Sequence, residues 1–518
     1  MKTENNPNTP VLERDDEHND SEHSNLIFQA QENKENKSNS HIQVQLKTDT
    51  NEGFSQSKYF HRGEEQIEKY IDTSITIGSE RNKASILKQQ KQNSMWTSFV
   101  LSCQIAMGID MFALPHALSY VSFFYGILLT IMYGVFTLVT LNMLAYVVIK
   151  KEVYEYSSLV RTILGKRVEL FFNIILFVSC FLNILAYINI EVQILGSSLY
   201  EFFYSQSNEY SNINDFLSGS FWSSFETRMM VIYLFTLVIL IPLCMQKEIG
   251  ELELISYLGL FSLAFMLIVI ILQTPFFYEH YLKSQYKPNK PDTHANWFSI
   301  SESFSTNLSF FTSNAILMYS YDLQFSIVPI YKSLKDNNIA NCQSLNFYTL
   351  LTTTVTFTTI SVFGFLTVPL NPPEFIIFRN SVTKGDMLMS FGKVLIGLCV
   401  SGQICMYFNS IRLCFFQIVR KSEEFSSKEN ILFVLFGYLT VSTLCIFFEK
   451  TTLYLSLIGA FTSVFYCYLF PGLMYVLTND HEKYSFVNVS VWLMTMLFTV
   501  LGLTAGVIDI INTVEGRS

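Results

Sequence analysis

Two acidic residues lie in long apolar stretches of the sequence, where a charged side chain is costly and usually serves a function. Asp110 follows Gly108 in the segment Gly-Ile-Asp-Met-Phe, and Glu191 ends the segment Tyr187-Ile-Asn-Ile-Glu. A carboxyl group in such a position can carry a proton or bind the amine of a solute. Structural roles stay open for both: a helix cap for Asp110 and a polar lock between helices for Glu191.

The residues around Asp110 favour a broken helix. Gly108 gives the backbone freedom, Asp110 can cap a new helix that starts near Met111, and Pro115 is tolerated in the first turn of that helix. A helix broken inside a bilayer persists only where it lines a cavity, and its freed amides and carbonyls attract charged groups. We therefore expect the backbone here to contact a substrate. The expected contacts are Ala106, Met107, Gly108, Ile109, Asp110 and Met111.

A second break is expected near Asp322, in the sixth apolar segment. Thr312, Ser313 and Asn314 precede the cluster Tyr-Ser-Tyr-Asp, and Pro329 follows it. Paired discontinuous helices form the substrate site of many secondary transporters. The expected side-chain contacts are Tyr319, Ser320, Tyr321 and Asp322. For Tyr319, a gate or wall of the site and a core aromatic both remain possible roles.

Four residues are candidates for coupling transport to an ion. They are Gln104, Asp110, Glu191 and Ser401. Gln104 lies about one helical turn before Gly108, and Ser401 offers an oxygen of the kind that coordinates sodium. Asn183, Tyr187 and Glu191 share one helix face at four-residue spacing. For Gln104 and Ser401, a simple hydrogen bond between helices is the alternative.

The sequence contains no motif of an enzyme or of a metal centre. A nucleophile elbow, a P-loop, a dinucleotide fingerprint and zinc-binding spacing are all absent. His116, the one histidine in an expected span, is interpreted as a packed or hydrogen-bonded residue. The cysteines are interpreted as small apolar fillers without a structural disulfide. We therefore expect no enzyme activity, no catalytic residue, no bound metal and no cofactor, with H⁺ or Na⁺ as coupling ions.

The elements that must position these residues are membrane helices. A spanning helix needs ~20 mostly apolar residues, and eleven segments qualify. They are roughly 95–119, 122–149, 168–200, 228–245, 253–274, 303–325, 344–369, 389–414, 429–448, 452–477 and 488–512. The expected fold is therefore an all-α membrane protein, since lipid leaves helices as the spanning form for such segments.

The chain divides into two regions at about Ser94. Residues 1–93 are rich in Asn, Gln, Ser, Glu and Lys, and are expected to form a disordered tail. Residues 94–518 are expected to form the transmembrane domain in the lipid bilayer. Basic residues near the helix ends favour a cytosolic N-terminus by about two to one. No basic block suggests a nucleic-acid partner.

Four motifs, in order, resemble the amino acid/auxin permease family. They are Gly108-x-x-x-x-Ala-Leu-Pro-x-Ala, Tyr156-Ser-Ser-Leu with Gly165 after it, Tyr319-Ser-Tyr-x-x-Gln before Pro329-Ile-Tyr, and Ser456-Leu-Ile-Gly-Ala before Phe470-Pro-Gly. The resemblance implies eleven spans, two inverted five-helix repeats plus one extra helix, and unwound first and sixth helices that hold an amino acid. Asp110 departs from the family, which has a second glycine there, and Gln104 replaces the asparagine of sodium-coupled members.

The sequence thus predicts a secondary active amino acid transporter that works by alternating access, coupled to protons more readily than to sodium. A sensor that binds amino acids with little transport is the alternative, and a membrane-embedded enzyme and a channel are further rivals. Both the plasma membrane and a lysosome-like vacuole fit. The amino acid, the direction of transport and the oligomeric state stay open.

Overall fold

The computed structural model describes residues 93–204, 225–244, 252–285, 309–369, 372–380, 386–420, 427–447, 451–479 and 486–514. Within these ranges the regular elements are helices, and the one extended pairing is an isolated bridge between Asn93 and Leu334. Contacts divide the chain into residues 1–89 and 90–518. The predicted disordered tail lies outside the described residues, apart from Asn93.

Among the described residues, eight helices are long and apolar enough to cross a membrane. Seven are formed by the single helices α5 (Phe123–Lys151), α7 (Lys166–Leu199), α11 (Leu252–Gln285), α15 (Ile339–Thr367), α16 (Met387–Arg420), α17 (Ser427–Phe447) and α20 (Phe486–Val514). The eighth combines α18 (Thr451–Leu457), the π-helix η6 (Ile458–Leu469) and α19 (Phe470–Thr478). A ninth is the pair formed by α3 (Met95–Ala106) and the helix over Ile109–Val121, which bends by 45°.

The remaining two expected segments are helical but interrupted. One consists of α9 (Phe225–Phe235), the π-helix η3 (Thr236–Leu240) and α10 (Ile241–Cys244). The other consists of α13 (Ser309–Ser320) and α14 (Gln324–Ser333). Each expected apolar segment thus coincides with helix over its described residues, so the all-α prediction is confirmed. The count of eleven spans and the two inverted repeats stay predictions.

The outer faces of these helices carry large apolar side chains. Phe436 of α17 and Leu493 of α20 are 70% and 68% exposed, and similar residues occur on most of the long helices. A soluble protein rarely exposes so many contiguous apolar side chains, because water disfavours them. The surface suits hydrocarbon surroundings, as expected for membrane helices.

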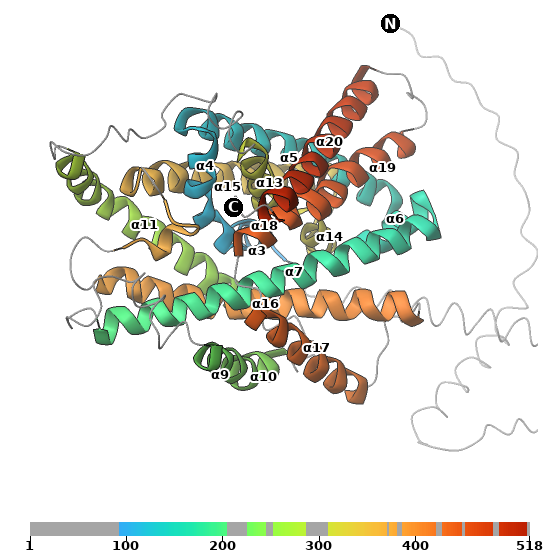
Figure 1. Ribbon diagram of the computed structural model, residues 1–518. Helices are drawn as coiled ribbons and strands as arrows, with labels where there is room; N and C mark the ends of the chain where they lie inside the picture. The colour runs from blue at the N-terminus through green and yellow to red at the C-terminus, as the bar shows by residue number, and fades with distance from the viewer. Residues whose placement is uncertain are drawn as a thin grey trace, which may run out of the picture. The chain divides into compact units, whose positions relative to one another are not determined.

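Helix α7 is the element against which much of the described part is arranged. It lies side by side with α16 and also contacts α6 (Tyr156–Leu164), α18, η6 and α9 (Figure 1). Helix α13 in turn contacts η6, α18, α20 and α4 (Leu114–Val121). Helix α13 therefore packs between the second half of the first span and the π-helical span η6.

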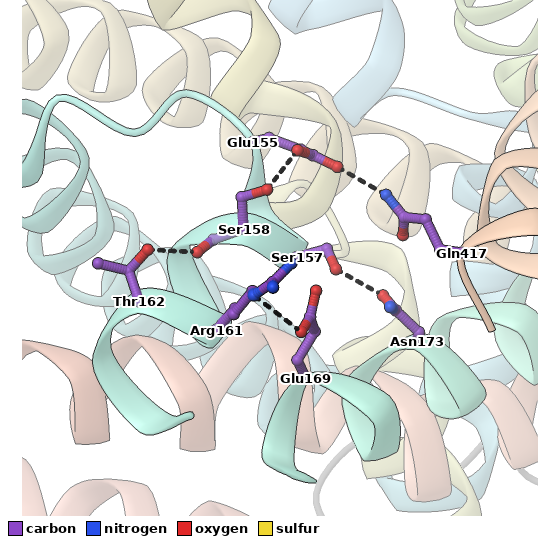
Figure 2. Close-up of polar contacts among 8 residues, drawn as sticks. All are labelled: Glu155, Ser157, Ser158, Arg161, Thr162, Glu169, Asn173 and Gln417. Carbon is purple, nitrogen blue, oxygen red and sulfur yellow. Dashed lines mark hydrogen bonds and ion pairs between the residues drawn. The ribbon is translucent and has the colours of Figure 1, made fainter. Parts of the chain in front are cut away.

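A short helix, α6, precedes the third expected span and contains the motif Tyr156-Ser-Ser-Leu. Figure 2 shows how it is fastened: Ser157 donates to Asn173 of α7 at 2.8 Å, and Gln417 of α16 donates to Glu155 at 2.9 Å. Gly165, with a φ of 91°, makes the turn from α6 into α7. The Tyr156 hydroxyl also donates to the Tyr466 carbonyl of η6 at 2.6 Å. Helix α6 thus braces α7 against two neighbouring spans.

Two expectations about local structure were wrong. Helix α11 continues through Pro275 to Gln285, although the apolar segment was expected to end at 274. The structure also joins Cys244 of α10 and Cys405 of α16 in a disulfide, with Cα atoms 5.3 Å apart. The expectation of no disulfide considered loops, whereas this pair lies between two helices. The other seven cysteines are free and buried, as apolar fillers would be, but Cys467 departs from that interpretation because it donates a hydrogen bond to Asp322.

Candidate functional site

The first spanning segment breaks where the sequence predicts it. Helix α3 ends at Ala106, Met107 leaves helical geometry with a ψ of 79°, and Gly108 is extended. A 3₁₀ helix, η1 (Ile109–Ala113), begins directly afterwards and leads into α4, with Pro115 in its first turn. Gly108 itself is the N-cap, so the prediction that Asp110 caps a new helix is wrong. The glycine is suited to this place because it offers no side chain to compete with Asp110.

The Asp110 carboxylate folds back over the break. A side chain at Gly108 would collide with Asp110 Oδ1, and it would begin 3.3 Å from the Tyr187 hydroxyl. Asp110 is 5% exposed, and its hydrogen bond is to its own backbone amide. Its carboxylate is thus buried beside Tyr187 without support from another side chain in the described part of the chain.

The sixth segment also breaks where predicted, between α13 and α14. Tyr321, Asp322 and Leu323 lie outside helix, and the Asp322 amide donates to the Tyr319 carbonyl at 2.9 Å. The Gln324 side chain accepts from the Leu323 amide at 3.1 Å and donates to Thr140 of α5 at 3.0 Å. A side chain from the next helix therefore satisfies one of the amides that the break frees.

The Asp322 carboxylate is held by three side chains of η6. Ser463 donates to it at 3.3 Å, Cys467 donates at 3.4 Å, and the Tyr466 hydroxyl donates to the same oxygen as Ser463. Tyr466 also pairs with Ser179 of α7, with 3.1 Å between the oxygens. Such a set of donors suits an ionised carboxylate, which only accepts hydrogen bonds.

A row of polar residues on α7 connects the two breaks. Ser179, Asn183, Tyr187 and Glu191 recur every four residues and are all buried. Tyr319 of α13 donates to Asn183 at 2.6 Å and to Tyr187 at 3.4 Å, while Ser179 reaches Asp322 through Tyr466. The predicted shared face of Asn183, Tyr187 and Glu191 is thus where the sixth segment docks. We call these four residues the α7 polar row.

Glu191, at one end of this row, pairs with Ser401. The Ser401 hydroxyl donates to Glu191 Oε1 at 2.9 Å, and Glu191 is 2% exposed. Gln104 of α3 contacts Cys399, two residues before Ser401, and its amide oxygen is buried without a hydrogen-bond partner. Three of the four expected ion-coupling residues therefore gather between α3, α7 and α16. The fourth, Asp110, lies at the break beside Tyr187.

Some expected contacts point elsewhere. Tyr321 donates to the Thr130 carbonyl of α5 at 2.9 Å, and Ser320 donates to Ile316 of its own helix at 3.0 Å. Neither side chain forms a hydrogen bond with the α7 polar row among the described residues. His116 forms hydrogen bonds through both ring nitrogens, to the Pro372 carbonyl at 2.9 Å and to Tyr120 at 3.0 Å, as its interpretation required.

A separate polar network ties the loop after α15 to its neighbours. Arg379 donates to Gln273 of α11 at 2.5 Å, Gln273 donates to Asp386 at 3.0 Å, and the Asp386 amide donates to Glu201 at 2.9 Å. The guanidinium also lies 4.1 Å from the centre of the Phe277 ring. Burial lowers the pKa of Arg379 to about 10, opposed by Asp386, so the side chain stays charged at neutral pH. This network holds the loop after α15 against α11, and none of its residues belongs to either break.

The geometry agrees with a family match that extends over most of the chain. The model of the transmembrane amino acid transporter protein family matches residues 91–515. The chain belongs to this family. Its match therefore includes both broken helices, the α7 polar row and η6. The membership confirms the family that the four motifs indicated.

Two curated proteins match parts of this chain. Vacuolar amino acid transporter 7 of Saccharomyces cerevisiae is 26% identical over 172 residues, which cover 33% of this chain and 30% of that protein. Sodium-coupled neutral amino acid symporter 2 of Danio rerio is 22% identical over 276 residues, which cover 50% of this chain and 53% of that protein. The matched parts thus span between about a third and a half of these relatives.

Solved structures resemble the fold at low sequence identity. MhsT in complex with L-phenylalanine aligns with a TM-score of 0.48 and 11% identity, covering 82% of this chain and 99% of that chain. A Na⁺-coupled sialic acid symporter aligns with a TM-score of 0.45 and 14% identity, covering 81% and 93%.

The residues that sequence reasoning missed come mainly from η6. Ser463, Tyr466 and Cys467 lie 141 to 145 residues after Asp322, to which they donate. Ser179 and Tyr407 were also missed; the Tyr407 ring meets the Tyr187 ring edge to face at 5.6 Å between centroids. One signal was present: Ser179 precedes Asn183 by four residues, which extends the face already identified on α7.

Proposed function

We propose that this protein is a secondary active transporter that carries amino acids across a membrane by alternating access, driven by protons rather than by sodium. The observation that carries the proposal is the meeting of two interrupted helices at the α7 polar row, in a chain of this family. Interrupted helices expose backbone amides and carbonyls, which can bind the carboxylate and the ammonium of an amino acid. Residues 106–111 and Tyr319 to Asp322 are the proposed binding segments.

Alternating access is supported by how the two halves of the site are attached. Hydrogen bonds from Tyr319 hold the sixth segment on α7. At the first break, by contrast, the Asp110 carboxylate bonds its own amide. We infer that the first segment can rock relative to the sixth segment while α7 and α16 stay together, as in the rigid-body motions of secondary transporters.

Proton coupling is supported by Glu191. It is buried, accepts a hydrogen bond from Ser401, and forms no ion pair within the described part of the chain. A buried carboxyl without a cation is stable when protonated and costly when charged, which is the property of a proton carrier. Sodium has weaker support, because the described side chains near Gln104 and Ser401 offer few oxygens for the six or so ligands of a hard cation.

Orientation and location belong to the proposal as well. The excess of basic residues in alternate loops supports a cytosolic N-terminus. The yeast relative is named as vacuolar, and the zebrafish relative is named as a sodium-coupled symporter. The plasma membrane and a vacuole-like membrane are therefore the two locations to test.

The test is uptake by the purified protein in liposomes. We expect labelled amino acids to accumulate when the outside is made acidic without sodium, and not when sodium alone is supplied. Glu191→Gln should abolish accumulation driven by the pH gradient while exchange of internal for external amino acid continues. Glu279→Gln is the matched control, because Glu279 is an exposed residue paired with Lys283 on the same helix.

Three results would contradict the proposal in whole or in part. Accumulation that persists in both Asp110→Asn and Glu191→Gln would remove these residues from proton coupling. Binding of amino acids without any flux in wild-type liposomes would favour the sensor. Accumulation that requires sodium at symmetric pH would keep the transporter and reverse the coupling ion.

A further inference from the structure

A site with one carboxylate at each of its two breaks does not match the charges of a neutral zwitterion. A zwitterion presents one carboxylate and one ammonium, so its site must offer positive as well as negative potential. Here Asp110 lies at the first break and Asp322 at the second. Both breaks adjoin Tyr187: Asp110 lies beside its hydroxyl, and Tyr319, three residues before Asp322, donates to it at 3.4 Å. Within the described residues, neither is part of an ion pair.

The first break already contains a carboxylate of the chain itself. Asp110 folds over Gly108 and accepts a hydrogen bond from its own backbone amide. One amide of the break is thus engaged by Asp110, and the other freed amides are the groups that would receive the solute carboxylate. Asp110 is 95% buried, without a partner side chain, and therefore needs a positive charge from elsewhere when it is ionised.

The second break keeps its anion in place by a different means. Tyr466, Ser463 and Cys467 donate to Asp322 and thereby favour its charged form. These donors are neutral, so the negative charge itself is not compensated. Two buried carboxylates of this kind leave a net negative potential between the breaks.

The aromatic residues around the two carboxylates also favour binding of a cation. The Tyr187 hydroxyl lies beside the Asp110 carboxylate at Gly108, and Tyr319 donates to this hydroxyl at 3.4 Å. The Tyr407 ring meets the Tyr187 ring edge to face at 5.6 Å between centroids, and Tyr466 donates to Asp322. Tyrosine rings attract ammonium and guanidinium groups through their π faces, and such rings surround cations in many binding sites. Carboxylates together with tyrosines are thus the chemistry of a cation site.

We infer that the solute is a cation, namely a basic amino acid with a second ammonium or a guanidinium group on its side chain. This inference rests on the proposed function and names the solute class for the same site. One positive group of the solute pairs with Asp110 at the first break, and the other pairs with Asp322 at the second. An amine that lacks the carboxylate shares this chemistry. Neutral amino acids supply one positive group for two carboxylates and bind more weakly.

The test is competition against uptake of labelled lysine and, in parallel, of labelled leucine. Competitors are arginine and ornithine, leucine and glutamine, glutamate, and the amines cadaverine and agmatine. We expect the basic amino acids to compete about tenfold better than the neutral ones, as fits one lost charge-assisted hydrogen bond. Cadaverine or agmatine competing as well as lysine would retain the cation site and identify an amine as the solute.

Variants separate the two carboxylates. Asp110→Asn and Asp322→Asn should each weaken competition by lysine about tenfold more than competition by leucine. Asp336→Asn is the matched control, because Asp336 is exposed in the loop after α14. Asp322→Asn keeps one acceptor oxygen for three donors and could fail to fold; Asp110→Asn then still decides, since Asp110 bonds its own amide.

The outcomes distinguish this inference from the proposed function. Leucine or glutamine competing as well as lysine would overturn the cationic solute and leave amino acid transport intact. Lysine competition unchanged in Asp110→Asn would overturn the role of the first carboxylate. Absence of flux for every amino acid in wild-type liposomes would overturn the proposed function itself.

Discussion

The two interrupted helices differ in what holds the carboxylate at each break. At the sixth segment, Asp322 receives hydrogen bonds from Ser463, Tyr466 and Cys467, and Gln324 bonds the Leu323 amide of the break. At the first segment, Asp110 bonds its own amide. Distant parts of the chain thus hold the carboxylate at the sixth segment, whereas the carboxylate at the first segment has no partner side chain among the described residues.

The difference teaches how a site can be both precise and mobile. A carboxylate fixed by three donors keeps its position when the solute leaves, because its hydrogen bonds do not depend on the solute. A carboxylate without partner side chains is costly when charged, so it favours binding of a cation or a proton. We interpret the sixth segment as the fixed half of the site and the first segment as the responsive half.

The largest effect is expected from Gly459→Val, which disturbs the packing of η6 against the sixth segment, the fixed half of the site. A side chain at Gly459 of η6 would collide with the Ala315 carbonyl of α13. Separating these helices should cost about 3 kcal/mol, as overpacking of a close contact does, and should displace Asp322 from its donors. The melting temperature in detergent should fall strongly, and uptake should be lost. Ala340→Val, at an exposed position at the start of α15, is the control and should leave both unchanged.

A smaller effect is expected from Asp322→Ala. The substitution leaves Ser463, Tyr466 and Cys467 without their acceptor, and buried donors without a partner cost about 1–3 kcal/mol. The melting temperature in detergent should fall clearly below that of the wild type. A melting temperature equal to the wild type would mean that these bonds do not organise the sixth segment.

Tyr319→Phe should have a modest effect. It removes the hydrogen bonds from the hydroxyl to Asn183 and Tyr187 but keeps the ring. We expect about 0.5–1.5 kcal/mol less stability, the usual net contribution of such bonds, and slower uptake because α13 is held less firmly on α7. Tyr348→Phe, an exposed tyrosine of α15, is the matched control. Unchanged uptake with Tyr319→Phe would exclude the α7 polar row from positioning the sixth segment.

The smallest effect on stability is expected from Asp110→Ala. Its carboxylate has no partner side chain in the described part of the chain, so its removal should change stability by less than about 0.5 kcal/mol or raise it slightly. Uptake of labelled lysine should nevertheless fall about tenfold, because the first break then lacks its carboxylate. A melting temperature that falls as far as that of Asp322→Ala would erase the difference between the two breaks.

The sequence predicts those features that depend on residue type and short spacing. Gly108 and Pro115 indicate the first break, and the structure places it at Met107 and Gly108. Four-residue spacing indicates that Asn183 and Tyr187 share a face, and Tyr319 donates to both. These features are local, since helix geometry alone determines them.

Features that depend on tertiary contacts could not be predicted. Ser401 reaches Glu191 across 210 positions in the chain, and the donors to Asp322 are more than 140 positions away. The π-helical form of η6, which aims Ser463, Tyr466 and Cys467 at one carboxylate, has no clear sequence signal. The disulfide between Cys244 and Cys405 escaped for the same reason, because its residues come from two separate helices.

Hydrogen exchange of the purified protein tests the central claim most directly, namely that the two breaks form the solute site. Exchange is followed by mass spectrometry with and without a saturating concentration of the amino acid that the uptake panel selects. We predict protection of the amides at residues 106–111 and at Tyr319 to Leu323, larger in the first segment because it is less supported beforehand. Protection confined to other helices, or no protection despite measured binding, would contradict the account.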